Sequence, residues 1–131
     1  MSGIEAGHRH PLARARGLGS AQDGSGHWWA QRVTAVALAL LTPWFLWLLL
    51  PLLDAGQAEA RAAIAGPLTA SLLIAYLLAL FWHARLGIQV VLEDYVHSRV
   101  LELTLQLGSR FVFTLAAIVS VVAIGRIAFL T

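Results

Sequence analysis

A histidine inside an apolar run, followed by an acid and a tyrosine where the run ends, is the pattern in this sequence that could do chemistry. His83 lies within the run, and Asp94 and Tyr95 lie where it meets a cluster of charges. Ionisable groups within a membrane segment are costly to bury and therefore indicate function. On an unbroken helix, Asp94 lies only about 20° around the axis from His83, and Tyr95 lies about 18 Å farther along it. The spacing predicts a buried nitrogen ligand and, several turns away, a polar site at the membrane edge.

The imidazole of His83 has three interpretations: a hydrogen bond across a helix interface, a step in a proton path, or a metal ligand. Gly87 lies one turn along on the same face, where the missing side chain lets a flat ring approach the backbone. A b-type haem needs a neutral imidazole ligand with open space beside it. No second histidine lies at a similar depth in the sequence, so a bis-histidine haem would require a partner subunit.

The pair formed by Asp94 and Tyr95 has two interpretations. One is an interfacial aromatic residue beside a solvated acid. The other is a quinone site, in which the Tyr95 hydroxyl donates a hydrogen bond to a quinone carbonyl and Asp94 orients its surroundings. A site at the membrane edge suits a quinone, because this apolar molecule carries two polar carbonyls.

Two arginines lie near these residues in the sequence. Arg32 is either a positive anchor at the membrane surface or a partner for haem propionates or Asp94. Arg85 lies about 200° around the helix from His83, so the two cannot share a face. Snorkelling towards the membrane surface is the expected role of Arg85, and contact with a haem propionate is the alternative.

The composition is that of an integral membrane protein. Hydrophobic residues make up 59% and charged residues 12% of the 131 residues, whereas a soluble domain carries about 25% charged residues. The basic residues are all arginines and are dispersed, which excludes the clustered basic face of a nucleic-acid-binding protein. Cysteine is absent, which excludes thiolate metal sites and disulfides.

Three apolar segments predict an all-α membrane protein with three transmembrane helices, at about residues 32–53, 67–93 and 104–129. They form a membrane anchor domain, 30–131, preceded by a glycine-rich flexible tail, 1–29. A short loop, 54–66, and a polar connector, 96–103, join the spans. Arginines gather in the tail and near its end, so the positive-inside rule places the N-terminus in the cytoplasm, together with the polar end of the second span.

The residues around His83 and Tyr95 resemble those of a known family. The run His-Ala-Arg-Leu-Gly at 83–87, followed by Glu-Asp-Tyr-Val at 93–96, resembles the hydrophobic membrane anchor of bacterial succinate dehydrogenase, respiratory complex II. The segments 17–21 and 27–35 are similar to the bacterial form as well. The resemblance covers about residues 17–131.

The resemblance implies a multi-pass subunit of the bacterial inner (cytoplasmic) membrane that is not catalytic by itself. In such an assembly a flavoprotein subunit oxidises succinate, an iron–sulfur subunit relays electrons to ubiquinone, and two membrane anchor subunits hold the relay on the membrane. His83 matches the axial ligand that this type of anchor gives to haem b, and the second membrane anchor gives the other ligand. Tyr95 matches the hydrogen-bond donor to ubiquinone, with Asp94 beside it.

Other interpretations remain open at the level of the sequence. The chain could anchor another quinone-linked enzyme such as fumarate reductase, because neither the quinone type nor the direction of catalysis is written in it. It could also be a haem-free membrane scaffold or assembly protein in which His83 simply packs. A transporter is disfavoured, because polar residues do not converge at the midplane on broken helices.

Overall fold

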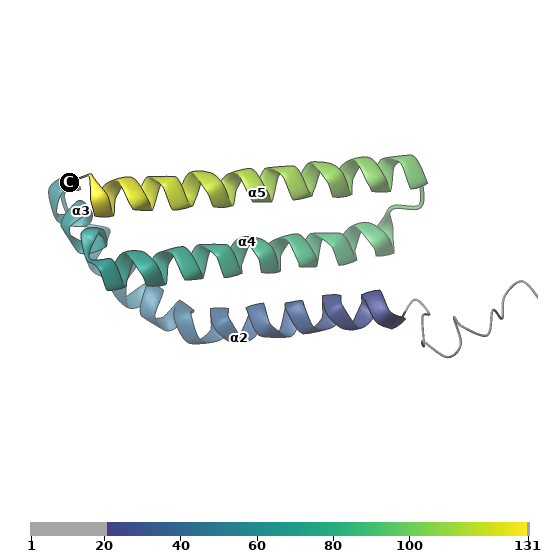
Figure 1. The fold of residues 1–131 in the computed structure, drawn as a ribbon, viewed down its shortest axis with the longest axis horizontal. Helices are drawn as coiled ribbons and strands as arrows, with labels where there is room; N and C mark the ends of the chain where they lie inside the picture. The colour runs from purple at the N-terminus through teal and green to yellow at the C-terminus, as the bar shows by residue number, and fades with distance from the viewer. Residues whose placement is uncertain (1–20, 131) are drawn as a thin grey trace, which may run out of the picture. The chain divides into compact units, whose positions relative to one another are not determined.

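The computed structural model describes residues 21–130, and the regular secondary structure of this range is entirely helical (Figure 1). Its elements are α2 (Ala21–Leu52), α3 (Gln57–Ala65), α4 (Pro67–Tyr95) and α5 (Arg99–Phe129). The chain divides into two compact units, residues 1–30 and 31–131, so α2 enters the second unit at Gln31.

Three of these helices are long and apolar enough to cross a membrane, which confirms the predicted all-α fold with three spans. The candidate spans are Ser25–Leu52, Pro67–Tyr95 and Arg99–Phe129, of 28, 29 and 31 residues. A crossing needs about 20 residues, so each helix has turns to spare. A helix suits this environment because its backbone donors and acceptors are paired within the segment.

The observed helices extend beyond the predicted apolar segments. α2 begins at Ala21, within the stretch predicted as a tail, and α5 begins at Arg99, which shortens the connector to Val96–Ser98. The added turns of α5 contain Arg99, Leu101 and Glu102, which favour helical geometry. The start of α2 contains Gly24 and Gly26, which do not favour it, so local propensity does not account for that extension. The remaining part of the predicted tail, residues 1–20, lies outside the described residues.

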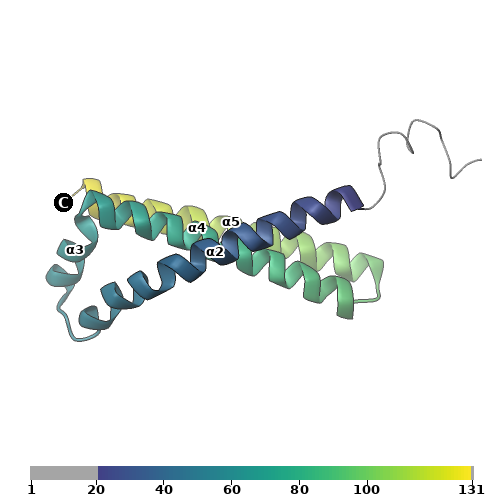
Figure 2. The same cartoon turned by 90° about the horizontal axis from the view of Figure 1, so that it is seen from below.

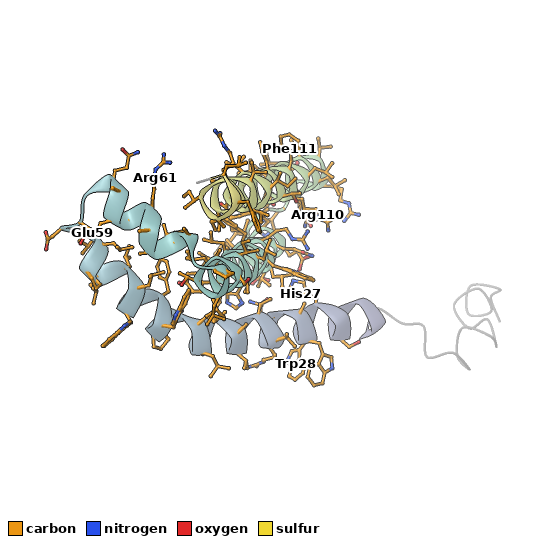
Figure 3. All side chains as sticks on the ribbon, turned by 60° about the vertical axis from the view of Figure 1, so that its left-hand side comes forward. His27, Trp28, Glu59, Arg61, Arg110 and Phe111 are labelled. Atoms are coloured by element: carbon orange, nitrogen blue, oxygen red, sulfur yellow. The ribbon has the colours of Figure 1, made fainter. Side chains whose placement is uncertain are left out.

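The predicted loop between the first two spans contains a helix of its own, α3. Its sequence is Gln-Ala-Glu-Ala-Arg-Ala-Ala-Ile-Ala, and alanine is the best helix former. Glu59 in the first turn also stabilises the helix, because its negative charge lies near the positive end of the helix dipole. α3 ends at Ala65, with Gly66 as its C-cap, and Pro67 then opens α4 at a position that tolerates a missing N–H. It contacts α4 and α5. Its Glu59 and Arg61 are exposed, and Arg61 lines a pocket with residues near the end of α5, among them Ala123 and Arg126 (Figure 3).

α4 carries most of the buried side chains of the second unit. Four of its residues are buried, Ala70, Leu73, Tyr76 and Leu86. Trp44, Phe45 and Leu48 of α2 pack against the cluster of Ala70, Leu73 and Ile124, together with side chains from the other helices. From Gln31 onwards α2 crosses α4 at an angle, whereas α5 runs alongside α4 (Figure 2). α4 is therefore the helix that both of the other spans use as a packing surface.

An aromatic pair forms part of the contact between α2 and α4. The rings of Phe45 and Tyr76 are stacked, with centroids 4.5 Å apart and planes inclined by 20°. Offset stacking of this kind adds about 0.5–1.5 kcal/mol beyond the area it buries. His83 lies seven residues after Tyr76, two helical turns along on the same face of α4. His83 therefore lies on the same face of α4 as the aromatic pair.

Candidate functional site

The imidazole of His83 faces α2, where it meets Thr34. The Thr34 Oγ1 and His83 Nδ1 atoms are 3.0 Å apart. Thr34 is only 7% exposed, and its hydroxyl also donates to the Gln31 carbonyl at 3.1 Å. Because Nδ1 is engaged in this bond, Nε2 is the nitrogen that His83 offers to a further partner.

Open space adjoins Gly87 on the same side of α4. Four residues correspond to about 40° of rotation, so Gly87 lies almost directly above His83 on the helix. A Cβ atom added at Gly87 would meet no atom within 4 Å, apart from its neighbours and its own helix backbone. Among the described residues, no side chain from another part of the chain comes within 4 Å of this position, one turn from the imidazole.

These two features fit the donor set that a b-type haem requires. The residues that the structure describes contain no group of three or more His, Cys, Asp or Glu side chains that could hold a metal ion. A haem needs only one imidazole from each of two ligating positions and room beside the ring. His83 offers one such nitrogen, and the space at Gly87 is compatible with the edge of a flat macrocycle.

The Asp94 and Tyr95 pair lies at the end of the same helix. α4 runs unbroken from His83 to Tyr95, so the pair is separated from the imidazole by roughly 18 Å of helix axis. The helix ends there because Val96 adopts an extended conformation, with φ −97° and ψ 115°, while its N–H still bonds to the Leu92 carbonyl. Tyr95 is 77% exposed. The structure therefore presents the tyrosine outward and does not bring it to His83.

The two arginines singled out in the sequence occupy different places. Arg32 is exposed on α2 and lies two residues before Thr34, about 200° around that helix. Arg85 is half-buried, with its Nε buried and without a hydrogen-bond partner among the described residues. It lines an apolar pocket of about 430 Å³ between α4 and α5, together with Leu78, Phe81, Trp82, Phe113, Thr114 and Ala117. The prediction that Arg85 and His83 cannot share a face is confirmed, since His83 faces α2.

Thr34 was not among the residues predicted for this site. A signal was available: Thr34 is a polar residue near the start of the first span, and His83 lies towards the end of the second. In antiparallel helices these positions fall at a similar depth. Hydropathy alone did not separate Thr34 from Thr42, which lies farther along the same helix.

Comparisons with known proteins place the chain in a family. Residues 7–125 match the model of the succinate dehydrogenase/fumarate reductase transmembrane subunit. The chain belongs to this family. As a family member with three apolar helices, it is a multi-pass membrane protein, and its family role is to anchor an enzyme complex on the membrane.

Individual relatives support the same conclusion. The chain is 31% identical over 116 residues to the succinate dehydrogenase hydrophobic membrane anchor subunit of Rickettsia bellii, covering 88% of this chain and 93% of the relative. It is 33% identical over 85 residues to the subunit of the same name from Paracoccus denitrificans, covering 65% of this chain and 66% of the relative. No solved structure matches the chain. The resemblance to the bacterial succinate dehydrogenase anchor is confirmed.

Proposed function

We propose that this chain is the membrane anchor subunit of a succinate:ubiquinone oxidoreductase in a bacterial inner membrane, where it contributes one axial ligand to haem b and part of the ubiquinone-reduction site. The observation that carries the haem assignment is the His83 imidazole, held by Thr34 through Nδ1 and adjoining the open space at Gly87. The relatives named above favour succinate dehydrogenase over fumarate reductase, since both carry the former name.

The chain's own residues have distinct tasks in the haem site. His83 would hold the iron through Nε2, Gly87 would give clearance to the ring, and Arg32 is the candidate for contact with a propionate. The other axial ligand would come from the second membrane anchor. When bound, haem b supplies a one-electron carrier within the membrane.

At the quinone site, the Tyr95 hydroxyl would donate a hydrogen bond to a carbonyl of ubiquinone. Its position supports this role, because an exposed tyrosine at a helix end can meet the polar head of a molecule whose tail stays in the lipid. Asp94, next to it, would orient the surrounding polar groups. The arginine-rich N-terminal side favours a cytoplasmic location for both residues, where the iron–sulfur and flavoprotein subunits would dock.

The direct test is purification of the complex through this subunit, followed by identification of the co-purifying chains and a reduced-minus-oxidised visible spectrum. We expect a flavoprotein subunit, an iron–sulfur subunit and a second anchor, together with a b-type haem band. The same chains without haem would contradict the ligand role of His83. No such chains would contradict the anchor role in this complex and favour a scaffold protein.

A substitution at Gly87 tests the proposed space for the haem ring. Gly87→Leu should leave this chain inserted, because no atom of the described structure lies within 4 Å of the new Cβ and leucine is favourable in a membrane helix. We expect the haem content of the purified complex to fall at least severalfold, since a leucine side chain would occupy the position of the ring.

Gly125→Leu is the matched control for this prediction. A Cβ at Gly125, on α5, also meets nothing within 4 Å, and Gly125 has no place in the proposed haem site. Its haem content should equal that of the wild type, measured per mole of flavoprotein. Full haem occupancy in the Gly87→Leu complex would show that the ring does not lie there.

A further inference from the structure

We propose that Thr34 is a positioning residue that fixes the tautomer of His83, so that Nε2 carries the lone pair that ligates the haem iron. The inference rests on the proposed haem function and adds to it a residue, a hydrogen-bond direction and a ring nitrogen. It comes from the contact between Thr34 on α2 and His83 on α4, which are 49 residues apart in the sequence.

The direction of the two hydrogen bonds follows from the chemistry of their atoms. A threonine hydroxyl has one hydrogen to donate and two lone pairs, whereas a backbone carbonyl can only accept. The hydroxyl hydrogen of Thr34 therefore points to the Gln31 carbonyl, at 3.1 Å. In the 3.0 Å contact with His83, the Thr34 oxygen is then the acceptor, and Nδ1 carries the hydrogen. A neutral imidazole has one N–H, so Nε2 is left with its lone pair.

The position of Thr34 makes this arrangement specific. Its side chain is 7% exposed, so water does not compete freely for the Nδ1 hydrogen. The β-branched side chain has few rotamers in a helix, and the bond from its hydroxyl to the preceding turn selects one of them. The acceptor therefore has a fixed place relative to α2, and the stacked pair of Phe45 and Tyr76 is a second contact between α2 and α4.

The two linked hydrogen bonds, from His83 to Thr34 and from Thr34 to the Gln31 carbonyl, should raise the basicity of the imidazole. Metal-ligating histidines generally donate their second N–H to a carboxylate, carbonyl or water, which orients the ring and raises its basicity. Here a hydroxyl takes that place, and its own donation to Gln31 makes it a better acceptor. A more basic imidazole stabilises the ferric state over the ferrous state and lowers the midpoint potential of the haem. Removing the acceptor should raise that potential.

Three variants of the intact, purified complex test this role. Thr34→Val keeps the shape and branching but removes the hydroxyl, Thr34→Ser keeps the hydroxyl, and Thr42→Val removes a hydroxyl elsewhere on α2. Each complex is examined by redox titration of the haem band, by electron paramagnetic resonance of the oxidised haem, and by its haem content. His83→Ala is measured in parallel to test the haem ligation itself.

We expect Thr34→Val to raise the midpoint potential, to change the resonance spectrum, and to weaken haem retention by about 10-fold, the lower end of the usual loss when such a partner is removed. Thr34→Ser should restore the wild-type potential and spectrum, and Thr42→Val should match the wild type. A structural role alone would not produce an upward shift that serine reverses.

Other results would contradict either the role of Thr34 or the proposed haem function. If His83→Ala loses haem but Thr34→Val has the wild-type potential and spectrum, the tautomer role is wrong and the haem function stands. A downward shift in Thr34→Val, or an equal defect in the valine and serine variants, also contradicts the hydroxyl role. If His83→Ala keeps its haem, the proposed function itself is wrong.

Discussion

Replacement of His83 by alanine is expected to remove haem b from the complex while the three spans remain inserted. Loss of an outer-sphere partner weakens metal binding by about 10- to 100-fold, and loss of an axial ligand should exceed that range. Alanine is a strong helix former, so α4 should persist, and the pair of Phe45 and Tyr76 should still hold α2 against it. The measurement is the reduced-minus-oxidised spectrum, normalised to the flavin content of the purified complex.

His97→Ala is the appropriate control for this variant. His97 is an exposed histidine in the connector between α4 and α5, outside the helices. Its removal changes the histidine content of the chain by the same amount and should leave the spectrum as it is in the wild type. An unaltered haem band in His83→Ala would refute the ligand assignment and return His83 to a packing role against Thr34.

Replacement of Tyr95 by phenylalanine should slow ubiquinone reduction by about fivefold. A hydrogen bond contributes about 1 kcal/mol net, and 1.36 kcal/mol in a barrier corresponds to tenfold in rate. The side chain is 77% exposed, so the variant loses no internal packing and should assemble normally. Oxidation of succinate with an artificial electron acceptor should remain at the wild-type rate, because that assay bypasses the quinone.

The chain offers its own control, since it contains one other tyrosine. Tyr76 lies on the same helix but is buried against Phe45, far from the end of α4. Tyr76→Phe keeps the stacked ring and should leave both assays unchanged. If Tyr95→Phe lowers both assays equally, the residue acts on the assembly of the complex rather than on quinone.

The periodic features of this fold were predictable from the sequence. Three apolar runs of sufficient length predicted the three spans, because a segment that crosses the lipid core has few alternatives to a helix. The opposite placement of His83 and Arg85 followed from 3.6 residues per turn, and the structure confirms it. The spacing of His83 and Tyr95 was interpreted on the condition of an unbroken helix, and α4 does run without interruption to Tyr95, two residues past the predicted end of the span at 93.

Features that depend on contacts between helices were not predictable in this way. α3 escaped detection because nine residues are too few for a hydropathy signal, although their alanine content favours a helix. The role of Thr34 depends on where α2 crosses α4, and that crossing is set by side chains such as Phe45 rather than by local sequence period. The roles of His83 and Tyr95 stay predictions, because both proposed sites would be completed by groups from other chains.

The small number of buried side chains has a consequence for how the cell must produce this subunit. Among the residues whose exposure is described, 25–130, five hydrophobic residues and Thr34 are buried, while large apolar side chains are exposed along all three spans. A single copy in the bilayer is therefore held in place by lipid more than by its own packing. We expect copies made in surplus to be loosely folded and open to membrane proteases, so that no reserve accumulates. Matched synthesis of all the subunits would then be a requirement of this architecture, and the scarcest subunit would set the yield of the enzyme.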